Sequence, residues 1–211
     1  MINTPRTIPG AILASDLIEL SKYAAFFTAV SDVRLFCVHG YARSIPASVI
    51  LQTFGCEVSS VPGGLEAHEM AGGETVKIVS GKTGLLGSPR IWLFDTTVEN
   101  AFAAWVVARF IDPLSDCRFV SKTHEEKVLV ELDNADFAAE FFPLESDENQ
   151  LNALIEEFEF HNFSILTNTV IPFLRQPATY DLLRDVTWES VFTFCDQIWA
   201  TAQFKCQTAG R

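Results

Sequence analysis

The sequence predicts an α/β protein in which a parallel sheet flanked by helices is followed by a mostly helical α+β second domain. Two observations favour this fold class. In residues 1–75, apolar runs typical of buried strands alternate with stretches whose apolar residues recur three and four positions apart. After residue 90, one strong strand precedes a long apolar helix and further helical stretches. We expect two domains, at residues 1–75 and 91–211, joined by a Gly-rich linker at residues 76–90.

The elements of the first domain are set by short patterns and by the residues that end them. We expect a helix at 16–30, a buried strand at 32–38, a helix at 44–55 that Gly55 closes, a strand at 56–61 and a short helix at 65–72. Because strands joined through a helix pair in parallel, residues 33–38 and 57–61 should be parallel neighbours. Residues 8–11 should pack near the edge of that sheet.

The second domain opens with the strand RIWLFD at 90–95, followed by a long helix at 97–111 that Pro113 ends. CRFVS at 117–121 is a further strand, and KVLVEL at 127–132 is a candidate strand. Three helical stretches follow, at 148–160, 163–175 and 188–204. The acidic cluster from Glu145 to Glu159 fits the solvated face of a helix.

Composition limits the partners of the protein. The formal charge of −12 and the sequence pI near 4.7 argue against nucleic acid, which Lys and Arg side chains bind. No apolar run reaches the ~18 residues of a membrane helix, and we expect no signal peptide, because the first residues show no basic segment followed by an apolar core. Five cysteines at irregular spacing indicate reduced thiols in the cytoplasm. We therefore expect a small molecule or a protein as partner, and the oligomeric state stays open.

Cys37 is the strongest candidate for chemistry. It ends a buried strand and precedes a tight loop formed by Val38, His39, Gly40, Tyr41, Ala42, Arg43 and Ser44. Backbone N–H groups of residues 38–43 and the start of the next helix are placed to stabilise an anion, which would lower the pKa of the thiol. Cys37 is then a nucleophile at neutral pH; the alternative is a buried thiol at the end of a strand.

Three segments resemble the rhodanese family: TIPGAI at 7–12, CVHGYARSIPASVILQTFG at 37–55, and CEVSSVPGGLEAHEMAG at 56–72. The resemblance implies a rhodanese-like sheet over residues 7–75 that lacks the family's first strand, because seven residues precede Ile8. It also implies that Cys37 carries sulfane sulfur as a persulfide. Residues 38–43 would cradle the terminal sulfur.

The loop also leaves a second chemistry open. The basic residue that sulfurtransferases often place five positions after the cysteine is Ala42 here, and Arg43 follows it. A cysteine, five residues and an arginine also form the loop of cysteine phosphatases and arsenate reductases. Such an enzyme needs a general acid, and Asp16 or Asp112 would have to approach Cys37.

The segment WVVARFIDPLSDCRFV at 105–120 is similar to the C-terminal domain of the chromate-resistance protein ChrB. Trp105, Arg109 and Asp112 belong to the matching motif. "VENAFAA" stands where that motif usually carries Asp, Arg and Cys, so the second domain resembles the fold without the polar start of the motif.

The leading hypothesis is a rhodanese-like sulfurtransferase that carries sulfur on Cys37, within a chromate or oxyanion stress response. The small partner would be a sulfur donor or an oxyanion, and a protein could accept the sulfur. The alternatives are an oxyanion enzyme of the phosphatase or arsenate-reductase type, and a non-catalytic oxyanion sensor or interaction protein. We expect no cofactor and no metal, because no His or Cys pair has the spacing of a zinc site.

Overall fold

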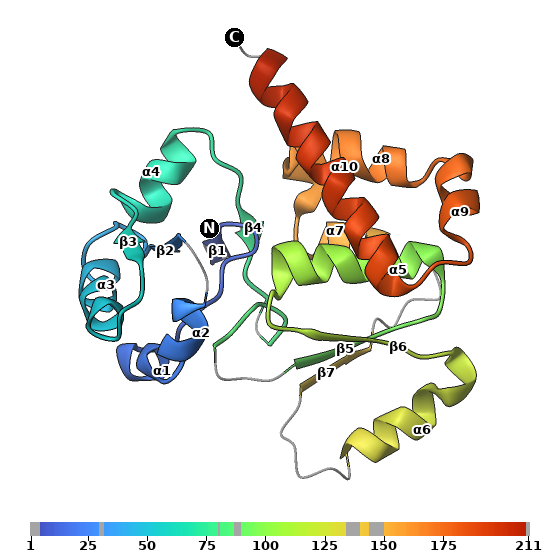
Figure 1. Cartoon of the computed structure of the whole chain (residues 1–211), viewed down its shortest axis with the longest axis horizontal. Helices are drawn as coiled ribbons and strands as arrows, with labels where there is room; N and C mark the ends of the chain where they lie inside the picture. Colours follow the sequence, from blue (N-terminus) through green and yellow to red (C-terminus); the bar gives the residue numbers. More distant parts are fainter. Residues whose placement is uncertain are drawn as a thin grey trace.

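The computed structural model describes residues 5–29, 32–79, 81–86, 90–133, 140–143 and 150–209. It is an α/β structure with small parallel sheets, as predicted. The elements form two groups, each around its own cluster of buried apolar side chains. Figure 1 shows the first group in blue to teal, beside the larger second group in green to red.

The first group contains a two-stranded parallel sheet and four helices. Its elements are α1 (Leu17–Lys22), α2 (Ala24–Thr28), β2 (Val33–Leu35), α3 (Ser44–Thr53), β3 (Val58–Ser60) and α4 (Gly64–Met70). Val33 pairs with Val58 and Leu35 with Ser60, so the predicted parallel pairing is confirmed. The strand β2 is shorter than the predicted 32–38, and it is not buried as expected, because Val33 and Leu35 are only half-buried and Arg34 is exposed. The single helix expected at 16–30 is instead two short helices. They meet at Tyr23, whose backbone leaves the helical conformation and whose N–H donates to the carbonyl oxygen of Leu20.

A small core holds the first group together. Leu20 and Phe27 of α1 and α2 pack with Ala47 and Leu51 of α3, and Leu86 from further along the chain joins them. The helix α3 ends as predicted, because Gly55 adopts a positive φ of 83° just after its C-cap Phe54.

The second group is built on a three-stranded sheet, β6-β5-β7, in which both pairs are parallel. Its strands are β5 (Arg90–Phe94), β6 (Asp116–Phe119) and β7 (Glu140–Pro143). The strands β5 and β6 confirm the sequence prediction. No strand was predicted at β7, which lies where the sequence indicated only a helical C-terminal half.

The prediction of a strand at 127–132 is wrong, since these residues belong to the helix α6 (Lys122–Asp133). Val128 and Leu129 are half-buried while Val130 is 55% exposed. An apolar run that is covered on one side only suits one face of a helix. Lys127 and Glu131 form an ion pair between positions i and i+4, which also favours the helix.

Helices form the rest of the second group. They are α5 (Val98–Val106), η1 (Val107–Ile111), α7 (Gln150–Glu157), η2 (Phe160–Asn162), η3 (Leu166–Val170), α8 (Ile171–Leu174), α9 (Pro177–Leu183) and α10 (Trp188–Ala209). The predicted helical stretches at 163–175 and 188–204 are confirmed, and the one at 148–160 is confirmed over Gln150–Glu157, while its residues 148 and 149 lie outside the described residues. Figure 1 shows α5, α7 and α10 on one side of the sheet and α6 on the other. Buried Phe102 and Trp105 place α5 at the centre of the larger core.

Of the predicted linker, residues 80 and 87–89 lie outside the described residues; among the others, Val76 belongs to the larger core and Leu86 to the small core. β4 (Val76–Lys77) pairs antiparallel with β1 (Arg6–Thr7). Gly84 donates its N–H to Ile111, and Gly10 donates to Phe110, each at 2.9 Å. The carboxylates of Glu157 and Glu159 bind Lys82 and Arg6, so part of the acidic cluster is paired rather than only solvated.

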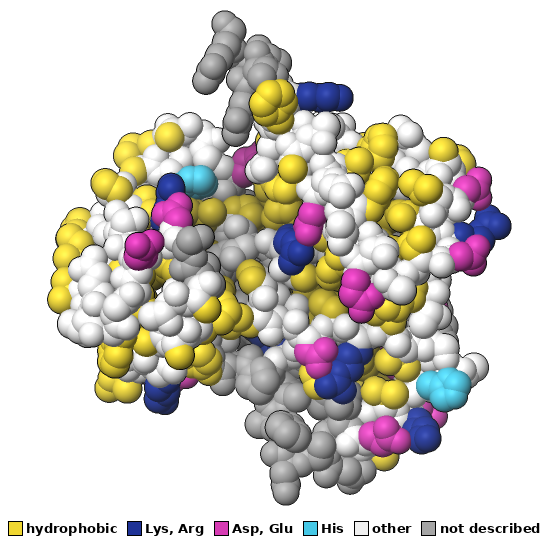
Figure 2. Space-filling model, viewed as in Figure 1, with side chains coloured by type: hydrophobic (Ala, Val, Ile, Leu, Met, Phe, Trp, Pro, Cys, Tyr) yellow, Lys and Arg dark blue, Asp and Glu magenta, His cyan; other side chains and the backbone are white. Residues whose placement is uncertain are grey.

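Two surface features bear on function. Large apolar side chains gather along the outer edge of α3 and α4, at the left in Figure 2; they include Ile45, Val49, Phe54 and Met70. Within the described ranges, no helix is both long and apolar enough to span a bilayer.

Candidate active site

Cys37 lies two residues after β2, in a loop that closes on the first turn of α3. Backbone groups of Gly40, Arg43 and Ser44 form hydrogen bonds to its sulfur. The N-terminal end of α3 therefore faces the thiol, and the dipole of the helix favours a negative charge there. This is the arrangement that the sequence predicted for the loop.

The electrostatics of the loop favour the thiolate. Burial by itself raises the pKa of Cys37, but the hydrogen bonds from Arg43, Ser44 and Gly40 outweigh it and lower the pKa from 9.0 to about 6. At pH 7 a thiol with this pKa is about nine-tenths ionised. Cys37 is therefore equipped to act as a nucleophile near neutral pH.

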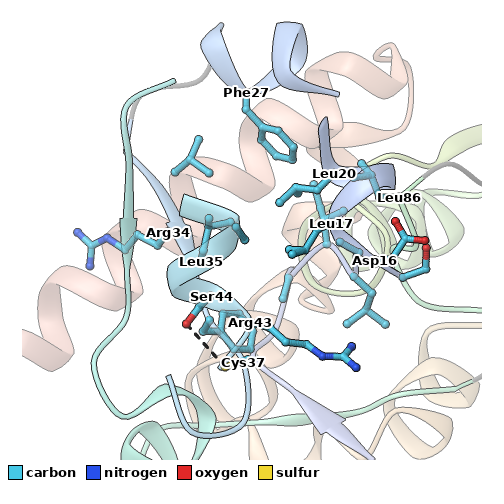
Figure 3. Close-up of a pocket in the computed structure, with 18 of the residues that line it drawn as sticks. Asp16, Leu17, Leu20, Phe27, Arg34, Leu35, Cys37, Arg43, Ser44 and Leu86 are labelled. Carbon is cyan, nitrogen blue, oxygen red and sulfur yellow. Dashed lines mark hydrogen bonds between the residues drawn. The ribbon is translucent and has the colours of Figure 1, made fainter. Parts of the chain in front are cut away.

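Two hydroxyl groups extend the hydrogen bonding around the sulfur. The Oγ of Ser44 lies 3.6 Å from the Sγ of Cys37, the contact drawn as a dashed line in Figure 3. The hydroxyl of Ser60, at the end of β3, can donate to the Oγ of Ser44 at 2.9 Å. It can instead donate to the carbonyl oxygen of Gly40 at 3.2 Å. When Ser60 donates to Ser44, the proton of Ser44 is left for the sulfur.

The shape of the loop depends on its contact with the turn before α4. A Cβ on Gly40 would lie 2.4 Å from the backbone nitrogen of Gly64, and one on Gly64 would lie 2.0 Å from the carbonyl oxygen of Cys37. Across this contact, Leu65 and Glu66 donate their N–H groups to the carbonyls of Cys37 and Val38, each at 3.1 Å. Both glycines also adopt positive φ. Only glycine allows this close approach.

Several side chains of the predicted loop are exposed. Val38 and Tyr41 are more than half exposed. The ring of His39 stacks on Tyr41, and its Nδ1 lies 2.9 Å from the carboxylate of Glu66. Ala42 is exposed as well. These residues contribute backbone to the loop, while their side chains are exposed; Val38 also lines the pocket next to Cys37.

A pocket of about 770 Å³ opens beside the loop, with Cys37, Arg43 and Ser44 in its lining. Figure 3 shows the Arg43 side chain extending away from Cys37 and apolar side chains on the further walls. Among the residues that the structure describes, the Arg43 guanidinium has neither an ion-pair nor a hydrogen-bond partner. Its charge therefore remains available to an anion.

The two carboxylates that the sequence offered as general acids occupy different places. Asp16 lines the same pocket as Cys37, but its Oδ1 accepts the N–H of Glu19 at 2.7 Å and so caps α1. Asp112 is fully buried, where it accepts hydrogen bonds from Arg90 at 2.8 Å and Trp92 at 3.1 Å. Of the two, only Asp16 belongs to the pocket.

The motif residues of the second group do not meet the Cys37 loop. Trp105 and Arg109 both donate to the carboxylate of Asp196 on α10, at 2.8 to 2.9 Å. The Arg109 guanidinium holds the pKa of Asp196 below its usual range. Asp112 faces β5 instead. These contacts tie α5 and η1 to α10 and to the sheet, which is a structural task.

The remaining described thiols are poorly suited to chemistry. Burial raises the pKa of Cys117 to about 11 and that of Cys195 to about 12. Cys56 is buried, and its thiol lies 3.4 Å from the carbonyl of Ala24. In the described part of the chain, no three His, Cys, Asp or Glu side chains are grouped to hold a metal ion.

Comparison with models of known families, with curated proteins and with solved structures finds no match to this chain.

The sequence did not point to two features of the site. Ser60 looked like an ordinary strand residue, yet it ends β3 beside the loop because β2 and β3 are parallel neighbours. The pocket wall formed by residues 10–17 was missed as well. The available signal was the rule that parallel strands end at a common edge, which brings position 60 close to position 37.

Proposed function

We propose that the protein is a sulfurtransferase that carries sulfane sulfur as a persulfide on Cys37. The observation that carries the proposal is the thiolate-stabilising loop: backbone groups of Gly40, Arg43 and Ser44 surround a thiol whose pKa is about 6. The resemblance of residues 7–75 to rhodanese segments agrees with this chemistry.

The loop suits both halves of such a cycle. In the first, the thiolate attacks the terminal sulfur of a donor, an S–S bond forms, and the donor leaves with the electron pair of its broken bond. In the second, a nucleophilic acceptor attacks the outer sulfur and Cys37 leaves as thiolate. A low pKa makes Cys37 a good leaving group, and the same N–H groups stabilise the charge in both steps.

The acceptor and the cellular setting follow as parts of the proposal. Val38, Tyr41 and Ile45 form an exposed apolar rim around the loop, which suits a protein that receives the sulfur. A persulfide carrier needs a reduced thiol, which the cytoplasm maintains. We place the activity in a chromate or oxyanion stress response on the resemblance of the second group alone.

Intact-mass spectrometry tests the proposal directly. After incubation with thiosulfate, the wild-type chain should gain one sulfur atom that cyanide removes. Cys37→Ser should gain none, while Cys117→Ser, which keeps the loop, should gain as much as wild type. A chain without any cyanide-labile adduct, or with an adduct that survives in Cys37→Ser, would contradict the proposal.

One observation favours a second candidate, an oxyanion enzyme of the phosphatase type. Cys37, Arg43 and Asp16 line one pocket, and the Arg43 guanidinium has no partner among the described residues. Such an enzyme should hydrolyse an aryl phosphate and lose this activity in Cys37→Ser, Arg43→Ala and Asp16→Asn. Hydrolysis in wild type without sulfur transfer would favour this candidate over the sulfurtransferase.

A further inference from the structure

The pocket beside Cys37 is polar at one end and apolar over most of its wall. The polar end includes the sulfur of Cys37, the hydroxyl of Ser44 and the charged side chain of Arg43. Two further charged residues line the pocket and have partners of their own: Asp16 caps α1, and Arg34 pairs with Asp32. The apolar wall includes Leu17, Leu20, Phe27, Leu35 and Leu86, which Figure 3 shows around the space next to α3. Leu20, Phe27 and Leu86 also belong to the small core, so this part of the wall consists of packed side chains.

The volume and the lining of the pocket suit an organic molecule. At about 770 Å³ it falls within the range of roughly 300 to 1,000 Å³ typical of sites for small ligands, which are mostly apolar with a few polar groups at fixed points. An inorganic dianion such as thiosulfate would occupy only the polar end. Leucine and phenylalanine walls offer such an ion no hydrogen bonds, whereas they stabilise an alkyl or aryl body by taking it out of water.

We propose that the sulfur donor of Cys37 is an organic sulfane-sulfur compound, with an anionic head at the Arg43 end of the pocket and an apolar body against Leu17, Leu20 and Phe27. This inference rests on the proposed sulfurtransferase function and adds the class of donor. An organic thiosulfonate, in which an alkyl or aryl group is joined to SO₂ and a terminal sulfur, has this form. Its charge matches Arg43, and its body matches the wall.

The transfer balances without any other reagent. The Cys37 thiolate attacks the terminal sulfur, and a new S–S bond forms with Sγ. The bond between that sulfur and the sulfonyl group breaks, and its electron pair leaves with the organic sulfinate. Cys37 ends as a persulfide anion, so the two negative charges before the step are two after it. The loop N–H groups face the charge that remains on the cysteine.

A chain-length series tests the donor class on the full chain. Methane-, butane- and hexanethiosulfonate are compared with thiosulfate, and the second-order rate constant of adduct formation on Cys37 is followed by intact mass. Each buried methylene is worth about fourfold in affinity, so the rate constant should rise at least about tenfold from methane- to hexanethiosulfonate. Glutathione with the same series corrects for differences in intrinsic reactivity.

Paired variants place the effect in the pocket. Leu17 lines the pocket, whereas its neighbour Ile18 is 73% exposed and does not. Leu17→Gln should reduce the gain with chain length to less than about threefold, while Ile18→Gln should keep the wild-type gain. A second pair adds bulk at exposed positions that leave the core alone. Ala14→Trp, in the pocket lining, should narrow the pocket and reduce the gain in rate constant with chain length. Ala25→Trp, outside the lining, should leave that gain unchanged.

The outcomes separate the two proposals. A rate constant that does not change with chain length, with an adduct on Cys37 still formed from thiosulfate, would overturn the organic donor and leave the sulfurtransferase intact. A gain that persists in both Leu17→Gln and Ala14→Trp would also overturn it. No adduct from any of the donors would remove the sulfurtransferase function and the donor class together.

Discussion

The hydroxyl of Ser44 lies 3.6 Å from the sulfur of Cys37, although seven positions separate the two residues along the chain. The loop folds back so that the first residue of α3 meets the residue that follows the strand. Ser44 is 2% exposed, and Ser60 donates to its oxygen at 2.9 Å, so the hydroxyl group is held in place. A fixed donor at this distance stabilises a thiolate more than a thiol.

Ser44→Ala should raise the pKa of Cys37, because one of the groups that favours the thiolate is removed. Sulfur loading, the transfer of one sulfur atom to Cys37, should slow about twofold at pH 6.5, because the loss of about 1 kcal/mol lowers the thiolate fraction about twofold there, and it should change little at pH 9, where the thiol is ionised in both chains. Stopped samples analysed by mass give the rates. Ser48→Ala, on the same helix but bonded to Ile45, is the control and should match wild type.

The reactivity of wild-type Cys37 should depend on pH with a midpoint near 6. Its pKa is lowered to about 6, so the thiolate dominates above that value and alkylation by iodoacetamide should reach a plateau by pH 7. Cys117, with a pKa of about 11, should stay unreactive over this range. A midpoint near 9 for Cys37, measured by peptide mapping, would show that the loop does not stabilise the thiolate.

The same shift couples the loop to the stability of the fold. A thiol whose folded pKa of about 6 lies below 9.0 adds stability that is fully present above pH 9 and is lost as the pH falls toward 6. Urea unfolding should therefore show a stability difference between wild type and Cys37→Ser that shrinks from pH 9 to pH 6. A constant difference would argue against this linkage.

Arg43→Ala should retain most of the sulfur loading from thiosulfate. The contact that Arg43 makes with the sulfur comes from its backbone, which alanine keeps. We expect a loss of less than about tenfold, the equivalent of 1.4 kcal/mol in the barrier. A loss beyond about a hundredfold, measured as a second-order rate constant, would place the guanidinium at the reacting anion and favour the oxyanion enzyme.

Gly64→Ala should disrupt the loop. Its φ of +58° costs alanine about 1 kcal/mol, and a Cβ 2.0 Å from the carbonyl of Cys37 should bring the total loss of stability to about 3 kcal/mol. Gly72 also has a positive φ, but a Cβ there meets nothing within 4 Å, so Gly72→Ala should cost about 1 kcal/mol. Urea unfolding gives both values. Only Gly64→Ala should slow sulfur loading.

Asp112→Ala should destabilise the fold by about 3 kcal/mol, because it leaves the charge of Arg90 buried without this carboxylate. Asp116→Ala is the control, since it breaks an exposed pair with Arg118 and should cost less than about 1 kcal/mol. A loss of stability in Asp112→Ala no larger than that in Asp116→Ala, both measured by urea unfolding, would contradict this prediction. Neither variant should alter the pH dependence of Cys37.

Local patterns predicted much of this architecture from sequence alone. The strand before Cys37, the helix that Gly55 closes and the parallel neighbour at 58–60 are confirmed because side-chain periodicity and glycine conformations act over a few residues. The mistaken strand at 127–132 has the same origin. Short apolar runs fit a strand and a helix equally well, and only packing separates them.

The sequence by itself determined that Cys37 would sit between a strand and a helix start, in a loop able to stabilise a thiolate. The tertiary structure alone decided what surrounds it. Ser60 lies beside the loop because β2 pairs with β3. Gly64 lies beside it because N–H groups in the first turn of α4 donate to the carbonyls of the loop. Trp105 and Arg109 meet Asp196 across more than eighty positions. These contacts join segments far apart in sequence, and their energies depend on distance in space, which no local pattern encodes.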